Sequence, residues 1–147
     1  MKSEGPKTAV LPKNLISTEK AKELNRNFNI KRADLHEKAI GKQDANAVWY
    51  SIEDLENYIE YIKTSGSEKG YVIDGIRFYF GVYSETDGKG KAGYSTLFLS
   101  PTGKSINARV AESSSSEQDQ ESGKDITSIE PLNFGSMGNP PKMEYGV

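Results

Sequence analysis

The sequence predicts an α+β domain, in which an antiparallel sheet of three to five strands is packed on one face by two helices. Three observations support this prediction. Apolar residues recur at helical spacing in segments before residue 66, strand-like runs lie between residues 71 and 100, and an Asp-Gly turn signal separates two of those runs. The length of 147 residues fits one domain.

Two helical segments open the body of the chain. Ser17 is a suitable N-cap, because its hydroxyl can accept an unpaired N–H of the first turn. The apolar residues of the helix that begins after Ser17 share one face: Ala21, Leu24 and Phe28. Residues 30–41 predict a second helix that ends at Gly41. Its inward-facing residues are Leu35 and Ala39.

The clearest helix spans residues 52–65. Ser51 precedes it and resembles a capping box with Asp54, where Glu or Gln is usual. Its apolar stripe has the spacing of one helix face: Leu55, Tyr58, Ile59 and Ile62. We expect the helix to stop at Gly66. A short strand at 47–50 precedes it, and this places Trp49 at the junction between helix and sheet.

The next strands are separated by turn signals. Asp74-Gly75 lies between two apolar runs and predicts a hairpin turn, since both turn residues must adopt positive φ. Residues 84–93 then form a loop, and residues 94–100 form a strand that stops at Pro101 and Gly103. A last edge strand is expected at 106–110.

A change in composition divides the chain. Residues 112–124 read ESSSSEQDQESGK and contain no apolar side chain. Such a segment cannot bury enough surface to offset its ordering entropy, so we predict a disordered linker. It separates a single α+β domain at 16–111, preceded by a flexible segment at 1–15, from an apolar C-terminal tail at 125–147. We expect the tail to dock on the domain or on a partner.

The composition excludes several classes of function. The absence of Cys removes disulfides and thiolate sites, and a single His removes any multi-histidine metal centre. We therefore expect no metal, no cofactor and no catalytic residue. The net charge of −2 is not typical of a nucleic-acid binder. The longest N-terminal apolar run, residues 9–11, is too short for a signal peptide, which predicts a cytoplasmic protein without membrane contact.

One glycine- and lysine-rich loop matches the pattern G-x-G-x-x-G, at residues 88–93. A dinucleotide site needs a helix after this pattern, whereas here a strand follows. The loop is typical of a mobile hairpin connection, and its amides and lysines could hold a small anion. The candidate ligand-binding residues are Gly88, Lys89, Gly90, Lys91, Gly93 and Arg77.

Aromatic and basic residues alternate along the central strand. Such a sheet face can stack bases, although the run IRFYFGVY lacks the pattern of RNA-recognition modules. It can also dock a protein, because Tyr and Arg are enriched at interfaces. The candidate partner contacts, together with the tail, are Tyr79, Tyr83, Tyr94, Leu132 and Phe134.

Two polar clusters favour solvated helix surfaces over chemistry. The first is the row Glu53, Glu56 and Glu60, and the second is the run Asp34 to Glu37, which contains the single histidine, His36. The sequence therefore predicts a small non-catalytic protein-interaction module. The first alternative is a binding protein or enzyme for a small anion, and the weaker one is a single-stranded nucleic-acid binder.

Overall fold

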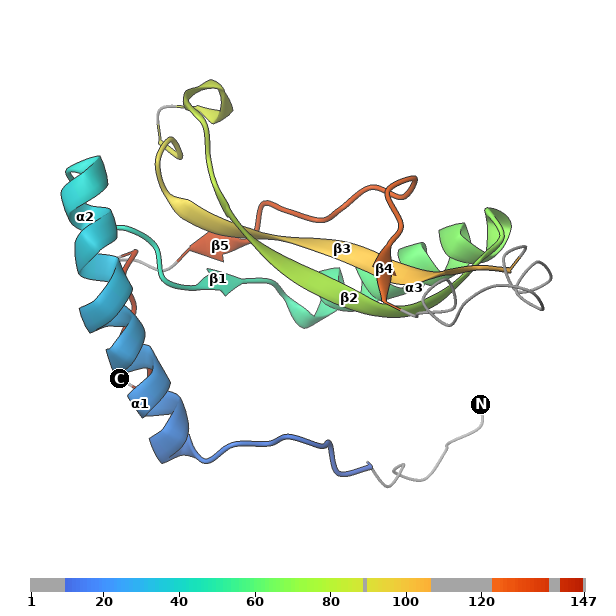
Figure 1. The fold of residues 1–147 in the computed structure, drawn as a ribbon, viewed down its shortest axis with the longest axis horizontal. Coiled ribbons are helices and arrows are strands. Elements are labelled where there is room, and N and C mark those ends of the chain that lie inside the picture. The colour runs from blue at the N-terminus through green and yellow to red at the C-terminus, as the bar shows by residue number, and fades with distance from the viewer. Residues whose placement is uncertain (1–9, 89, 107–122, 138–140, 147) are drawn as a thin grey trace, which may run out of the picture.

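The computed structural model describes residues 10–88, 90–106, 123–137 and 141–146, and it confirms an α+β fold with antiparallel sheets (Figure 1). The helical elements are α1 (Thr18–Phe28), the π-helical η1 (Asn29–Ala33), α2 (Asp34–Ile40), α3 (Ile52–Glu68) and the short 3₁₀ turn η2 (Glu85–Asp87). The strands are β1 (Val48–Trp49), β2 (Tyr71–Val82), β3 (Ser95–Ser105), β4 (Lys124–Asp125) and β5 (Ser136–Met137). The main sheet has the order β2-β3-β4, and β1 pairs with β5.

The first three helical elements form one continuous helical rod, residues 18–40 (Figure 1). The Ser17 hydroxyl caps it by accepting the N–H of Lys20 at 3.0 Å, and Gly41 ends it with a φ of 74°. Both ends agree with the sequence prediction. The prediction of inward-facing residues is wrong, because the rod lies at the end of the sheet and does not cover it. Three predicted core positions are exposed: Leu24, Leu35 and Ala39.

Helix α3 covers one face of the main sheet. The Ser51 hydroxyl accepts the N–H of Asp54 at 2.9 Å, as expected for a helix start. The predicted stop at Gly66 is wrong, since the helix continues to Glu68. Gly66 is buried against β2, where a Cβ would lie 2.5 Å from Cγ1 of Ile73. This glycine permits close helix–strand packing and does not end the helix.

The predicted hairpin turn at Asp74-Gly75 is also wrong. Strand β2 continues from Tyr71 to Val82, and its register with β3 shifts between Ile73 and Gly75, which is a β-bulge. The Asp74 carboxylate fixes the bulge by accepting the Thr102 hydroxyl at 2.6 Å. The chain reverses instead in the predicted loop, so β2 and β3 form one long ribbon.

Strand β3 does not stop at Pro101 and Gly103, because it occupies the middle of the sheet. Pro101 pairs with β2 in register, and its carbonyl accepts the N–H of Ile126 at 3.0 Å. On that side β3 pairs with β4 only at Thr102 and Gly103, so the N–H that proline lacks is not required by the β4 ladder. The predicted edge strand lies outside the described residues except for its first position, and the predicted linker does so up to residue 122.

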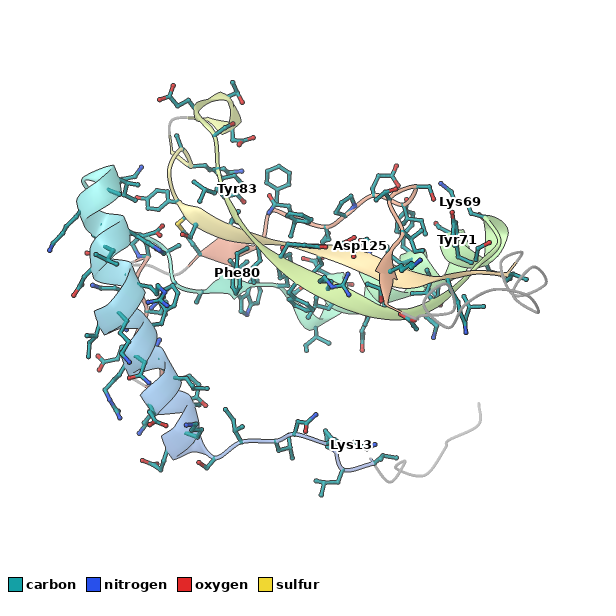
Figure 2. The ribbon with its side chains drawn as sticks, in the orientation of Figure 1. Lys13, Lys69, Tyr71, Phe80, Tyr83 and Asp125 are labelled. Carbon is teal, nitrogen blue, oxygen red and sulfur yellow. The ribbon has the colours of Figure 1, made fainter. Side chains whose placement is uncertain are left out.

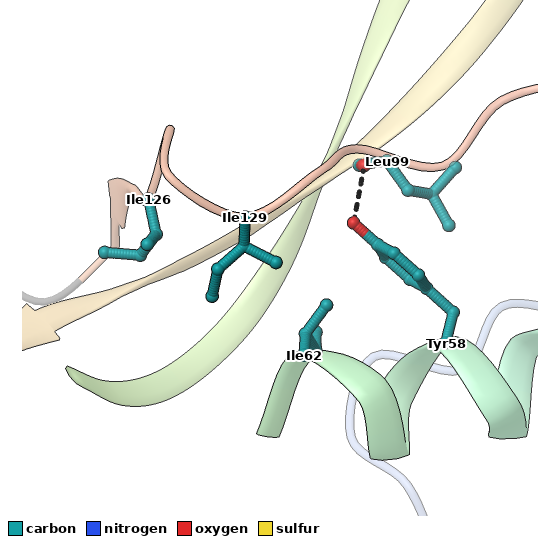
Figure 3. Close-up of a cluster of buried hydrophobic side chains, with 5 residues drawn as sticks. All are labelled: Tyr58, Ile62, Leu99, Ile126 and Ile129. Carbon is teal, nitrogen blue, oxygen red and sulfur yellow. Dashed lines mark hydrogen bonds between the residues drawn. The ribbon is translucent and has the colours of Figure 1, made fainter. Parts of the chain in front are cut away.

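The core joins α3, β3 and the C-terminal segment (Figure 3). Its buried members are Tyr58, Ile62, Leu99, Ile126 and Ile129. The Tyr58 hydroxyl lies 2.8 Å from the carbonyl oxygen of Glu130 and 3.2 Å from that of Leu99. Leu132 forms an antiparallel bridge with Leu99. The first part of the tail therefore docks on the chain's own domain.

The short sheet β1–β5 lies between α3 and the rod (Figure 1). Trp49 in β1 is 65% exposed, so it does not fill the helix–sheet junction as predicted. The last described segment, residues 141–146, lies against the rod. Lys142 Nζ donates to Glu37 at 2.7 Å, and the N–H of Tyr145 donates to Asn25 at 3.0 Å. Residues 141–146 are thus bound to the rod by hydrogen bonds at two of its turns.

Candidate functional site

An apolar cleft of about 840 Å³ lies between the rod and the end of the β2–β3 ribbon that is next to its connecting loop. We call this the outer end of the ribbon, and the end near α3 the inner end. The rod contributes Phe28 and Ile40, and β1 contributes Val48. The ribbon contributes Phe80, Val82 and Leu97. A volume of this size, with largely apolar walls, falls in the range of ligand and peptide sites.

The ribbon side of the cleft is a continuation of the core face. Directly opposite residues in an antiparallel pair share one face, and Phe78 pairs with Leu99 while Phe80 pairs with Leu97. Leu99 is fully buried under α3, whereas Phe80 is 89% exposed. We call the outer part of this surface the open apolar face, consisting of Phe78, Phe80, Val82 and Leu97. Its first three residues are 55%, 89% and 68% exposed.

A buried carboxylate connects the rod to the ribbon at the wall of the cleft. Asp44 is 2% exposed and accepts the N–H of Ala45 at 2.8 Å. It also accepts the N–H and the hydroxyl of Ser95, at 2.7 and 2.5 Å. His36 Nδ1 lies 2.9 Å from the second carboxylate oxygen. These contacts satisfy the charged group and connect the rod to the start of β3.

Ser95, Asp44 and His36 are residue types of a catalytic triad, but their order differs. In a triad the histidine stands between serine and carboxylate, so that it can take the serine proton. Here the Ser95 hydroxyl donates to Asp44, and Asp44 stands in the middle. The arrangement therefore positions the backbone and supplies no activated nucleophile. His36 is half-buried beside Phe28, with ring centroids 5.9 Å apart, and not on a plain surface as predicted.

Three consecutive amides of the glycine-rich loop, those of residues 91–93, donate to backbone carbonyl oxygens. The N–H groups of Lys91 and Ala92 donate to Gly88, at 3.1 and 3.0 Å, and that of Gly93 donates to Tyr83 at 3.0 Å. The Lys91 ammonium lies 4.2 Å from the ring centroid of Phe134. Gly90 is exposed, and Lys89 lies outside the described residues. The amides of residues 91–93 are thus already paired, while an anion site would need them free.

Arg77 contacts the C-terminal segment and not the loop. Its guanidinium donates to Asp125 at 2.7 Å and to the carbonyl oxygen of Gly123 at 2.6 Å. The hydrogen bond with Tyr79 and the negative charge of Asp125 raise the pKa of Arg77. The structure therefore separates Arg77 from the other candidate anion ligands.

The predicted aromatic face is largely occupied by internal contacts. Tyr79 stacks on Phe98 with ring centroids 5.0 Å apart, and its hydroxyl donates to Asp125. The Tyr83 hydroxyl donates to Asn133 at 2.9 Å. The Tyr94 ring lies 4.0 Å from the Lys42 ammonium. Figure 2 shows Tyr83 and Phe80 on the same ribbon.

The two tail candidates differ from each other. Leu132 is half-buried and paired with β3, whereas Phe134 is 71% exposed and contacts Lys91. Sequence reasoning missed the cleft and Asp44. The one available signal was the run Phe78, Phe80, Val82, which is apolar on a strand too long for α3 to cover.

Within the parts of the chain that the structure describes, no three acidic or histidine side chains lie close enough to hold a metal ion. None of the helices among the described residues is long and apolar enough to cross a membrane. Comparison with protein-family models, with curated proteins and with solved structures finds no match to this chain.

Proposed function

We propose that this chain is a non-catalytic protein-interaction module, and that it binds its partner through the open apolar face and the adjoining cleft. The observation that supports this most is the exposure of Phe80, 89%, near the end of a long strand where its backbone is still paired with β3. A sheet face that is exposed to water normally carries polar side chains. Here the face carries Phe78, Phe80 and Val82 in succession.

The chemistry of the cleft favours binding over catalysis. Its buried carboxylate, Asp44, is satisfied by hydrogen bonds, and its serine donates to that carboxylate. The remaining wall is largely apolar, with Arg32, Asn46 and Thr96 among its polar members. Contiguous exposed apolar patches with a polar rim are typical of protein interfaces. The contact surface proposed here replaces the aromatic face and the tail, whose side chains are largely engaged within the molecule.

Site-specific photo-crosslinking tests this function. Phe80 is replaced by a benzophenone amino acid in the full chain, and the cells that express it are irradiated. The matched control is the same replacement at Phe134, which is also an exposed phenylalanine but lies next to Lys91, outside the cleft. We expect a discrete protein adduct from position 80 and none from position 134. The absence of a discrete adduct at position 80 would contradict the proposal.

A further inference from the structure

A second apolar surface of this chain is uncovered. The N-terminal arm, residues 10–16, carries four large aliphatic side chains that are 58–89% exposed: Val10, Leu11, Leu15 and Ile16. Figure 2 shows Lys13, in the middle of the arm, far from Phe80 and from the sheet. No described part of the chain covers these side chains.

Local geometry keeps the arm separate from the rod. The cap at Ser17 fixes where α1 begins, so the arm cannot extend the helix. Pro12 and a turn at Asn14, where φ is 66°, prevent a continuous strand. The arm is therefore an irregular apolar segment that projects from the rod, and it requires side-chain contacts from elsewhere to be buried.

We propose that the partner of the open apolar face is a second copy of this chain, and that the arm of each copy lies on the face of the other. This inference rests on the proposed function. The two surfaces match in chemistry: the arm is aliphatic with Lys13 as its single charge, and the face consists of Phe78, Phe80, Val82 and Leu97. Both remain exposed in the single copy.

Reciprocity favours a closed dimer. Specific interfaces bury roughly 1,200–2,000 Å² in total. One arm of seven residues is short for that area, whereas two arms on two faces double it. A two-fold axis satisfies both arms and both faces at once and leaves no free site for a third copy.

Light scattering after size-exclusion chromatography tests the assembly with the full chain. We expect the unmodified chain to have twice the mass of 16.2 kDa. We compare an arm variant, Leu11→Asp with Leu15→Asp, and a face variant, Phe80→Asp with Val82→Asp. Each should raise the dissociation constant of the dimer at least tenfold. Phe134→Asp is the control and should remain a dimer. All of the substituted residues are exposed, so folding is checked by circular dichroism.

A mixing experiment separates the arm–face contact from a general loss of association. The face variant retains an intact arm, and the arm variant retains an intact face, so their mixture restores one of the two contacts. We expect a one-to-one heterodimer in the mixture, weaker than the unmodified dimer. An arm variant that stays dimeric, or a mixture that stays monomeric, overturns the proposal.

The two proposals can fail separately. If the unmodified chain is a monomer at about 100 times the concentration used for crosslinking, the second copy is ruled out. A crosslinked adduct at position 80 with a mass other than twice that of the chain would then retain the interaction module and assign it a different partner. An adduct of twice the mass is the result expected here.

Discussion

The two ends of the β2–β3 ribbon present the same sheet face to very different surroundings. Leu99 and Phe80 are close neighbours on that face, because Leu99 pairs with Phe78, which lies two residues before Phe80 on β2. Leu99 is fully buried, and Phe80 is 89% exposed. The inner end is covered by α3 and by the segment around Ile126 and Ile129. The outer end meets only the open cleft beside the rod.

This difference shows that strand alternation determines the face of a side chain but not its burial. A strand of twelve residues is about 40 Å long, and α3, at about 25 Å for seventeen residues, is too short to cover it. The exposed remainder is a stable part of the ribbon because its backbone is paired, so it is available for contacts with another molecule.

Removing residues 112–147 should have the largest effect on the comparison, because it uncovers the inner end as well. The truncation deletes Ile126 and Ile129 from the core and removes β4. We expect the truncated chain to lose its cooperative thermal unfolding transition, as measured by far-UV circular dichroism. The matched control removes residues 1–16, whose described apolar side chains are exposed, and should unfold cooperatively. A truncated chain that melts like the full chain would show that the tail does not form part of the core.

Replacing Asp44 should weaken the connection that holds the rod beside the ribbon. Asp44→Ala leaves the N–H groups of buried Ala45 and half-buried Ser95 without their acceptor, at a cost of about 1–3 kcal/mol for the buried group and less for the other. We expect a correspondingly lower free energy of unfolding in urea. Asp34→Ala is the control. Its carboxylate is exposed and lies 3.6 Å from Lys142, so it should cost less than about 1 kcal/mol. Equal losses in the two variants would contradict this role of Asp44.

Tyr58→Phe should have a smaller effect that depends on pH. Burial raises the pKa of Tyr58 to about 12 from an ordinary value of about 10. The folded chain therefore binds this proton more tightly than the unfolded chain. The resulting stability is complete below about pH 10 and is lost as the pH rises towards about 12. Tyr58→Phe should cost about 1 kcal/mol at neutral pH, from the hydrogen bond at its hydroxyl.

Denaturation of both chains across this pH range checks the prediction. The unmodified chain should lose more stability between pH 10 and pH 12 than the Tyr58→Phe chain. Parallel profiles would show that Tyr58 does not titrate differently in the two states.

Local signals in the sequence were sufficient for the helix starts. Ser17 and Ser51 cap the helices as predicted, because capping depends on neighbours only three residues away. Gly41 ends the rod for the same reason. The α+β class follows from these helices and from the strand pattern.

The errors arise where distant parts of the chain decide the structure. Asp74-Gly75 is compatible with a turn and with a bulge, and the pairing of Asp74 with Thr102 selects the bulge. Gly66 is compatible with a helix end and with close packing, and Ile73 selects the packing. The candidate site depends on Asp44, which contacts Ser95 across 51 positions in the sequence. No local pattern encodes that contact.

A matched pair of threonine substitutions tests the central claim most directly, which is that core side chains such as Ile129 cover the inner end of the face, whereas the outer end is free surface. Ile129→Thr and Val82→Thr both keep a β-branched side chain, and unfolding in urea is measured at concentrations that keep the chain monomeric. Ile129 is 1% exposed, so Ile129→Thr should lower the free energy of unfolding by about 2–4 kcal/mol, through lost apolar contact and a buried hydroxyl. Val82, 68% exposed, should change by less than about 0.5 kcal/mol. Similar losses at the two positions would show that the outer end is packed as core, and would contradict the account.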